Sequence, residues 1–105
     1  MKFEFIESPL FTAHLPDYLT DDEYSKLQEH LCEHPEAGKI VRGSGGVRKI
    51  RWKRDGTGKS SGVRVCYYVL SDDGHVYMLV IYAKSAMDSI PGPVLKAIKE
   101  AIHDA

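Results

Sequence analysis

Cationic residues gather in the middle of the chain. Between Lys39 and Arg64 the sequence holds nine of its fourteen Lys and Arg residues against one acid, Asp55. Several of these cations alternate with apolar residues such as Trp52 and Val65, which indicates strands with one buried side. Clustered Lys and Arg side chains on a folded surface attract phosphate groups. The stretch therefore predicts a surface that binds a polyanion.

Strand alternation sorts these cations by face, because side chains two residues apart along a strand point the same way. The side chains out of phase with the apolar set are expected to share one open face: Lys49, Arg51, Lys53, Arg64, Tyr68, Tyr82 and Lys84. Cations there would hold a phosphate backbone, and tyrosine rings would stack on bases. A merely solvated face is the alternative interpretation. We favour binding, because like charges on adjacent strands destabilise a sheet unless an anion offsets them.

The same residue types can cleave RNA without a metal, if the 2′-OH attacks the adjacent phosphate. Arginine suits the stabilisation of the charged phosphorane, since it is always protonated and grips two phosphate oxygens. Arg64 with Arg51 is the predicted pair for this role. Lys49 and Lys84 are the candidate acid or base, because positive neighbours make a lysine easier to deprotonate. Such chemistry depends on accurate positioning of the substrate.

Hydrophobic periodicity and turn residues predict the elements that position these side chains. A capping box, Thr20 with Glu23, opens the most strongly patterned helix, and Pro35 prevents its continuation. Glycines and Asp-Gly mark the connections between the later strands. The expected order is a strand at 2–7, helices at 9–18 and from Thr20 to Pro35, a loop at 36–46, strands at 47–53, 63–70 and 75–83, and a helix at 90–103.

This order, strand–helix–helix–strand–strand–strand–helix, predicts the fold class α+β. Three consecutive strands with hairpin-like connections make a small antiparallel meander, and we expect the helices on one face of it. A length of 105 residues with 43% hydrophobic content matches one domain, residues 1–105.

Composition excludes several protein classes. No apolar run has the length needed to cross a bilayer, and the N-terminus lacks the apolar core of a signal peptide. Cys32 and Cys66 have no short spacing typical of a zinc knuckle or redox pair. The loop Gly43-Ser44-Gly45-Gly46 is followed by a strand pattern and has no Gly-Lys-Ser/Thr, so it is not a P-loop. We expect a reduced, cytoplasmic protein with no membrane association.

A metal site is the rival interpretation of the histidines. His30, Glu33 and His34 match a His-x-x-Glu-His zinc pattern with both histidines on one helical face. Pro35 follows at once, and no third ligand is evident, although a catalytic zinc site needs three protein ligands. We therefore expect plain surface histidines and no bound metal or other cofactor.

Beyond these patterns, nearly the whole chain resembles the HigB branch of the RelE/ParE superfamily of bacterial toxins. The order and spacing of several pieces carry this resemblance: residues 3–11, the helix EYSKLQEHL, residues 34–38, 43–52, 58–59 and 62–68, and Tyr82-Ala83-Lys84. The resemblance implies a RelE-like microbial RNase fold of order βααβββα. It also implies a type II toxin that cuts mRNA in the ribosomal A site with Lys, Arg and Tyr side chains and no metal.

By position, the resemblance places the catalytic cations on Lys49, Arg51, Arg64 and Lys84. The tyrosine that some relatives have shortly after the last basic residue is missing, since the chain continues Ser-Ala-Met-Asp-Ser-Ile-Pro. Tyr82 is a candidate to replace it by stacking on a base. The remaining predicted RNA-binding residues are Lys53 and Tyr68 on the sheet, and Arg48, Arg54 and Lys59 at the edges or in loops that contact rRNA.

The resemblance further implies partners: the ribosome with its mRNA, and a cognate antitoxin, commonly of helix-turn-helix type. Two other functions stay open from the sequence. One is a non-catalytic module that binds nucleic acid or the ribosome through the same face. The other is a gyrase-inhibiting toxin of the same superfamily, against which Arg64 and Lys84 argue because that branch typically lacks the RNase residues.

Overall fold

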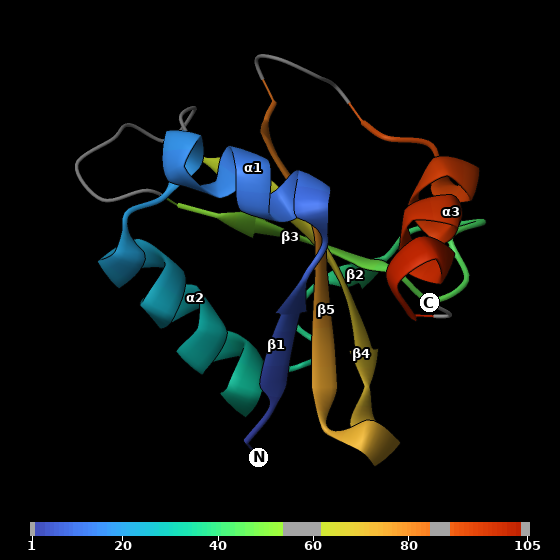
Figure 1. The fold of residues 1–105 in the computed structure, drawn as a ribbon, viewed down its shortest axis with the longest axis horizontal. Helices are drawn as coiled ribbons and strands as arrows, with labels where there is room; N and C mark the ends of the chain where they lie inside the picture. The colour runs from blue at the N-terminus through green and yellow to red at the C-terminus, as the bar shows by residue number, and fades with distance from the viewer. Residues whose placement is uncertain (1, 54–61, 85–88, 104–105) are drawn as a thin grey trace.

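Five strands and three α-helices make up the computed structural model, which describes residues 2–53, 62–84 and 89–103 (Figure 1). The chain order is β1 (Glu4–Glu7), α1 (Pro9–Tyr18), α2 (Asp21–Glu33), β2 (Lys39–Ile40), β3 (Arg48–Trp52), β4 (Val63–Leu70), a 3₁₀ turn (Ser71–Asp73), β5 (His75–Ala83) and α3 (Gly92–His103). The strands form one sheet in the order β1-β5-β4-β3-β2. The α+β class is confirmed.

The predicted meander is present as β3, β4 and β5, each antiparallel to the next. Two strand features differ from expectation. β1 pairs with β5 in parallel, so the sheet is mixed, and the N-terminal strand lies beside the last one. β2, a strand of two residues antiparallel to β3, lies within the segment expected to be a loop.

Both early helices begin at side-chain caps. The Ser8 hydroxyl accepts from the Phe11 N–H at 3.0 Å and donates to the Leu79 carbonyl at 2.7 Å, which ties the start of α1 to β5. The predicted capping box is present at α2, where the Glu23 N–H donates to Thr20 Oγ1 and the Thr20 N–H donates to Glu23 Oε1. These bonds satisfy backbone donors that a helix start otherwise leaves unpaired.

Helices cover both faces of the sheet, and the expectation of helices on one face is wrong for α3. α1 and α2 pack on one face around Phe11, Leu27 and Leu31. α3 packs on the opposite face, where Leu95 is buried. The reason is the second face of β4 and β5, which carries apolar and aromatic residues that need cover: Cys66, Tyr68, Leu70, Tyr77, Val80 and Tyr82.

A register irregularity explains one further difference. Between Cys66 and Tyr67 the pairing with β5 shifts by one residue, so that Cys66 pairs with Val80 but Tyr67 pairs with Met78. Leu79 is the extra residue of this bulge. It therefore belongs to the core beneath α3, whereas the sequence alternation placed it in phase with Ile81.

Candidate nucleic-acid interface

Arg51, Arg64 and Tyr82 form one row across the sheet. Arg51 on β3 pairs directly with Arg64 on β4, and Arg64 pairs with Tyr82 on β5. Directly opposite residues have Cβ atoms about 5 Å apart, so the two guanidinium groups start from neighbouring positions on the α3 side of the sheet. Lys49 lies in the next row, opposite Cys66, and on the same side.

The cations of these rows reach solvent. Arg51 is exposed, and Arg64 and Lys49 are half-buried. Gly62 lies beside them, since a Cβ at this position would lie 3.2 Å from the Trp52 carbonyl oxygen and 3.8 Å from Arg51 Nε. β2, β3 and β4, all of whose residues are described, contain no Asp or Glu. The row is therefore a concentration of positive charge without an acidic neighbour on those three strands.

Tyr82 is not available as a stacking platform. Its side of β5 is covered, and the residue is only 4% exposed. Its hydroxyl is the one buried side-chain polar atom without a hydrogen-bond partner among the described residues. Burial and the nearby Cys66 raise the pKa of the Tyr82 phenol, while the Arg64 charge acts in the opposite direction. The expectation that its ring lies on an open face is wrong, because alternation assigns a face and cannot show what covers it.

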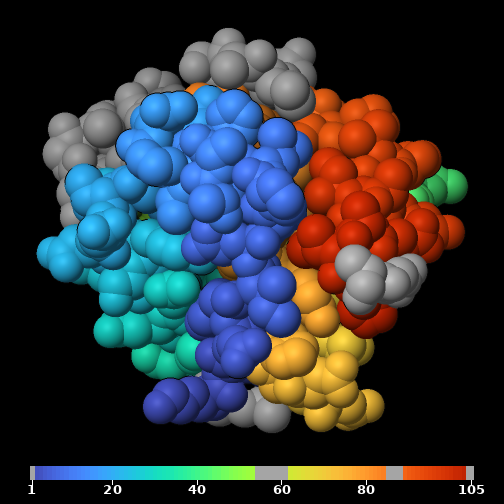
Figure 2. Space-filling model, in the orientation of Figure 1, coloured from blue at the N-terminus to red at the C-terminus, as the bar shows by residue number. Residues whose placement is uncertain are grey.

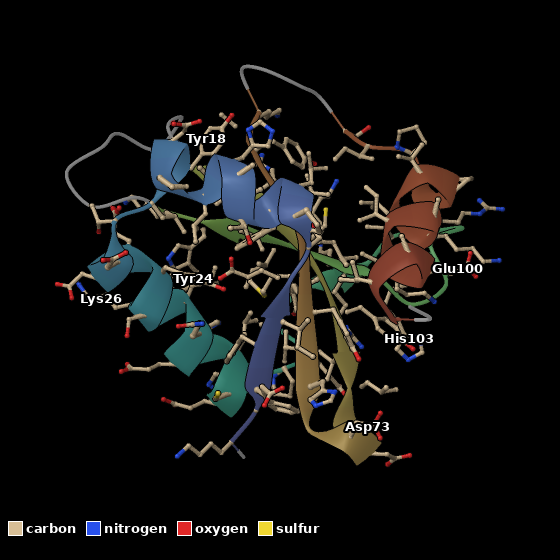
Figure 3. The ribbon with its side chains drawn as sticks, in the orientation of Figure 1. Tyr18, Tyr24, Lys26, Asp73, Glu100 and His103 are labelled. Carbon is tan, nitrogen blue, oxygen red and sulfur yellow. The ribbon has the colours of Figure 1, made fainter. Side chains whose placement is uncertain are left out.

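Tyr68 also lies away from the row of Arg51, Arg64 and Tyr82, which we call the arginine row. It is four residues beyond Arg64 on β4, about 13 Å along the strand. Lys99 Nζ lies 4.6 Å from the centre of its ring, and the His103 ring lies at 5.9 Å. Tyr68 is thus packed beneath the C-terminal half of α3, where Figure 3 labels His103. It does not share an open surface with Arg64 as predicted.

Arg48 belongs to the opposite face, in phase with Ile50 and Trp52. Its guanidinium Nη1 donates to the Gly38 carbonyl at 2.8 Å and to the Glu36 carbonyl at 3.4 Å. The Tyr67 hydroxyl holds the same segment, accepting from the Gly38 N–H and donating to the Pro35 carbonyl. Arg48 therefore fastens the chain between α2 and β2, a structural task that the sequence pattern did not indicate.

The remaining predicted residues lie at strand ends or outside the described ranges. Lys53 and Lys84 are exposed and directly follow Trp52 and Ala83, the two residues that flank Val63 across the sheet. Both lie two residues beyond the arginine row. Arg54 and Lys59 lie outside the described residues.

Burial also sets the chemistry of the thiol beside the site. Cys66 is fully buried between Lys49 and Val80, and desolvation raises its pKa to about 11 although the Lys49 charge acts to lower it. The thiol is therefore protonated at neutral pH and is not a nucleophile there.

The histidines of α2 lie on the other side of the molecule from this row. The His30 ring is 5.3 Å from both the His34 ring and the Trp52 ring. Within the described ranges, no group of three or more His, Cys, Asp or Glu residues is arranged to hold a metal ion. In the same part of the chain, no helix is long and apolar enough to span a bilayer.

Sequence reasoning missed one cation of this face, Lys39. It lies on β2 directly opposite Lys49. A strand of two residues leaves no alternation to detect, so only the structure reveals the pair.

Comparison with solved structures identifies the architecture. A variant of the toxin RelE from Escherichia coli, with two arginines replaced by alanine and solved in the free state, superposes with a TM-score of 0.58. The chain has the fold of RelE. The match covers 97% of this chain and 100% of RelE, at 20% sequence identity. No family model matches the sequence.

Proposed function

We propose that this chain is the toxin of a toxin–antitoxin pair, and that it cleaves mRNA on the ribosome without a metal. The observation that carries the proposal is the cross-strand pair Arg51–Arg64 with Lys49 in the adjacent row, on a RelE-like fold. The resemblance of the sequence to the HigB branch supports placing the toxin in that branch. It also supports an antitoxin of helix-turn-helix type as the partner.

The proposed reaction follows from these side chains. The 2′-OH of one nucleotide attacks its own 3′ phosphate, loses its proton to a base, and forms a 2′,3′-cyclic phosphate. The bond to the next nucleotide breaks, and its 5′ oxygen takes up a proton. Arg64 and Arg51 hold the phosphate oxygens as negative charge builds, an interaction that is strongest in the transition state. Lys49 and Lys84 are the candidates for the two proton transfers.

Substrate positioning explains why the ribosome is required. The two described tyrosines that were expected to stack on bases are buried or packed beneath α3, so this surface holds phosphates better than it orients bases. Accurate placement of the 2′-OH must then come from elsewhere. A ribosome that holds mRNA in one conformation supplies it, and we expect little cleavage of free RNA.

The test is the mapping of mRNA ends in a translating extract that contains the wild-type protein, Arg64→Ala or Lys26→Ala. Lys26 lies on α2, away from the proposed site, and is the matched loss of one cation (Figure 3). We expect new 5′ ends within codons for the wild type and Lys26→Ala, and about 100-fold slower cleavage for Arg64→Ala. Full cleavage by Arg64→Ala at equal folded concentration would refute the site.

Two other outcomes separate the rival functions. Inhibited translation with intact mRNA would identify a non-catalytic ribosome-binding module. DNA damage without mRNA loss in cells that express the protein would identify a gyrase inhibitor.

A further inference from the structure

A second pair of like charges lies beside the arginine pair. Lys39 on β2 is directly opposite Lys49 on β3. Lys49 in turn pairs with Cys66, which belongs to the core beneath α3, so both lysines point to the α3 side of the sheet. Lys39 is exposed at the sheet edge.

The two pairs form one continuous series of cations. From Arg64 the series passes to Arg51 on the neighbouring strand, then to Lys49 two residues back along β3, and then to Lys39 across to β2. Each step spans about 5–7 Å between side-chain bases. We refer to Arg64, Arg51, Lys49 and Lys39 as the cationic path. It leads from the centre of the sheet to its β2 edge.

The cationic path is suited to an anionic partner. Like charges directly opposite each other on neighbouring strands are destabilising, and here two such pairs are adjacent. The strands that carry them, which are described throughout, contain no Asp or Glu. A phosphodiester backbone fits the arrangement, because its charges recur at regular intervals along a flexible strand.

Two other routes away from Arg64 on this face, across to β5 and along β4 toward Tyr68, are covered. Tyr82, the next residue of the row toward β5, is buried. Along β4, the neighbour Cys66 is buried, and Tyr68 lies under Lys99 and His103. Toward β2, in contrast, Lys49 is half-buried, and Lys39 is exposed.

We propose that the mRNA strand next to the cleaved bond follows the cationic path, and that Lys39 contacts one of its phosphates. This inference rests on the proposed function and assigns a role to a residue outside the predicted site. The substrate strand thereby leaves the protein at the β2 edge.

The experiment uses ribosomes programmed with synthetic mRNAs in which one phosphate at a time, on either side of the cleaved bond, is a neutral methylphosphonate. We expect Lys39→Gln to lower kcat/KM about two- to five-fold, the range of a single exposed charge contact. One methylphosphonate position should slow the wild type by a similar factor and should slow Lys39→Gln no further. Lys26→Gln should behave as the wild type at every position.

The outcomes separate this inference from the function on which it rests. Wild-type rates for Lys39→Gln, with the wild type active, would overturn the path and leave the function standing. A Lys39→Gln loss that multiplies with every methylphosphonate effect would assign Lys39 to rRNA and also overturn it. No cleavage by the wild type would refute both. Equal thermal unfolding of wild type and Lys39→Gln shows that a loss of rate is not a loss of fold.

Discussion

At the scale of single residues, Tyr67 and Tyr82 carry the same hydroxyl group in opposite circumstances. The Tyr67 hydroxyl bonds to the Gly38 N–H at 2.8 Å and to the Pro35 carbonyl at 2.9 Å. Tyr67→Phe would leave both backbone groups without this partner, and we expect it to lower the free energy of unfolding by about 2 kcal/mol. Urea denaturation measures the change. A neutral result would show that water replaces the hydroxyl.

Tyr82→Phe should change the free energy of unfolding in the opposite direction. The Tyr82 hydroxyl is buried and has no hydrogen-bond partner among the described residues, which costs free energy, and its removal leaves the packed ring in place. We expect the free energy of unfolding to rise by up to about 1 kcal/mol, and cleavage of mRNA to equal that of the wild type because the ring is buried. A more stable Tyr82→Phe protein with slower cleavage would show that the hydroxyl acts on RNA.

Sequence reasoning placed the cations better than the tyrosines. Lys49, Arg51 and Arg64 share one side of the sheet because alternation along a strand depends only on backbone geometry. Whether that side is open depends on tertiary packing, which hid Tyr82 and Tyr68. The structural role of Arg48 on the other face was equally unpredictable from local sequence. Its hydrogen-bond acceptors are carbonyls about ten residues earlier in the chain.

At the scale of elements, α3 is held against the loop between β2 and β3. Gly92, its first residue, is buried, and a Cβ there would overlap the Arg42 carbonyl oxygen. Lys99 Nζ donates to the Gly45 carbonyl at 3.0 Å and fastens the helix about two turns further along. The loop that leads into Lys49 and Arg51 is thus fixed by the helix that covers the sheet.

Gly92→Ala tests this attachment. Alanine normally stabilises a helix relative to glycine by up to about 1 kcal/mol. Here the methyl group has no space, so we expect a loss of about 1–3 kcal/mol in thermal unfolding. The comparison is Ala97→Gly, at an exposed position of α3, where only the ordinary propensity cost of about 1 kcal/mol applies. A Gly92→Ala protein more stable than the wild type would contradict the close packing.

Helices and long strands were predictable because their signals are local. The capping box fixed the start of α2, and Pro35 fixed its end. The position of α3 on the second face, the parallel pairing of β1 and the bulge at Leu79 depend on contacts between distant segments. No short window of sequence carries that information.

At the scale of the whole molecule, buried phenols and a buried thiol make stability sensitive to alkali. Burial raises the pKa of Cys66 from 9.0 to about 11, and it also raises the pKa values of Tyr67, Tyr77 and Tyr82. Above pH 9 the unfolded chain releases the Cys66 proton while the folded chain retains it. This contribution to stability is therefore complete below pH 9 and is lost as the pH rises to about 11.

We expect the free energy of unfolding to fall by up to about 1.4 kcal/mol per pH unit between pH 9 and 11 from Cys66 alone. Urea titrations of wild type and Cys66→Ala at several pH values measure it. The variant should be less stable at pH 7 but should show a shallower decline from pH 9 to pH 10. Identical slopes would mean that the thiol does not titrate differently in the two states.

The parallel pairing of β1 with β5 has a consequence for biosynthesis. β5 lies between β1 and β4, so the N-terminal strand has no sheet partner until residues 75–78 have been made. The Ser8 hydroxyl that caps α1 likewise bonds to Leu79, 71 residues later in the chain. Contacts of such long sequence separation slow folding, because a large loop must close before they form. The arginine row also includes Tyr82 on β5, so a nascent chain acquires the assembled surface only after β5 has been made.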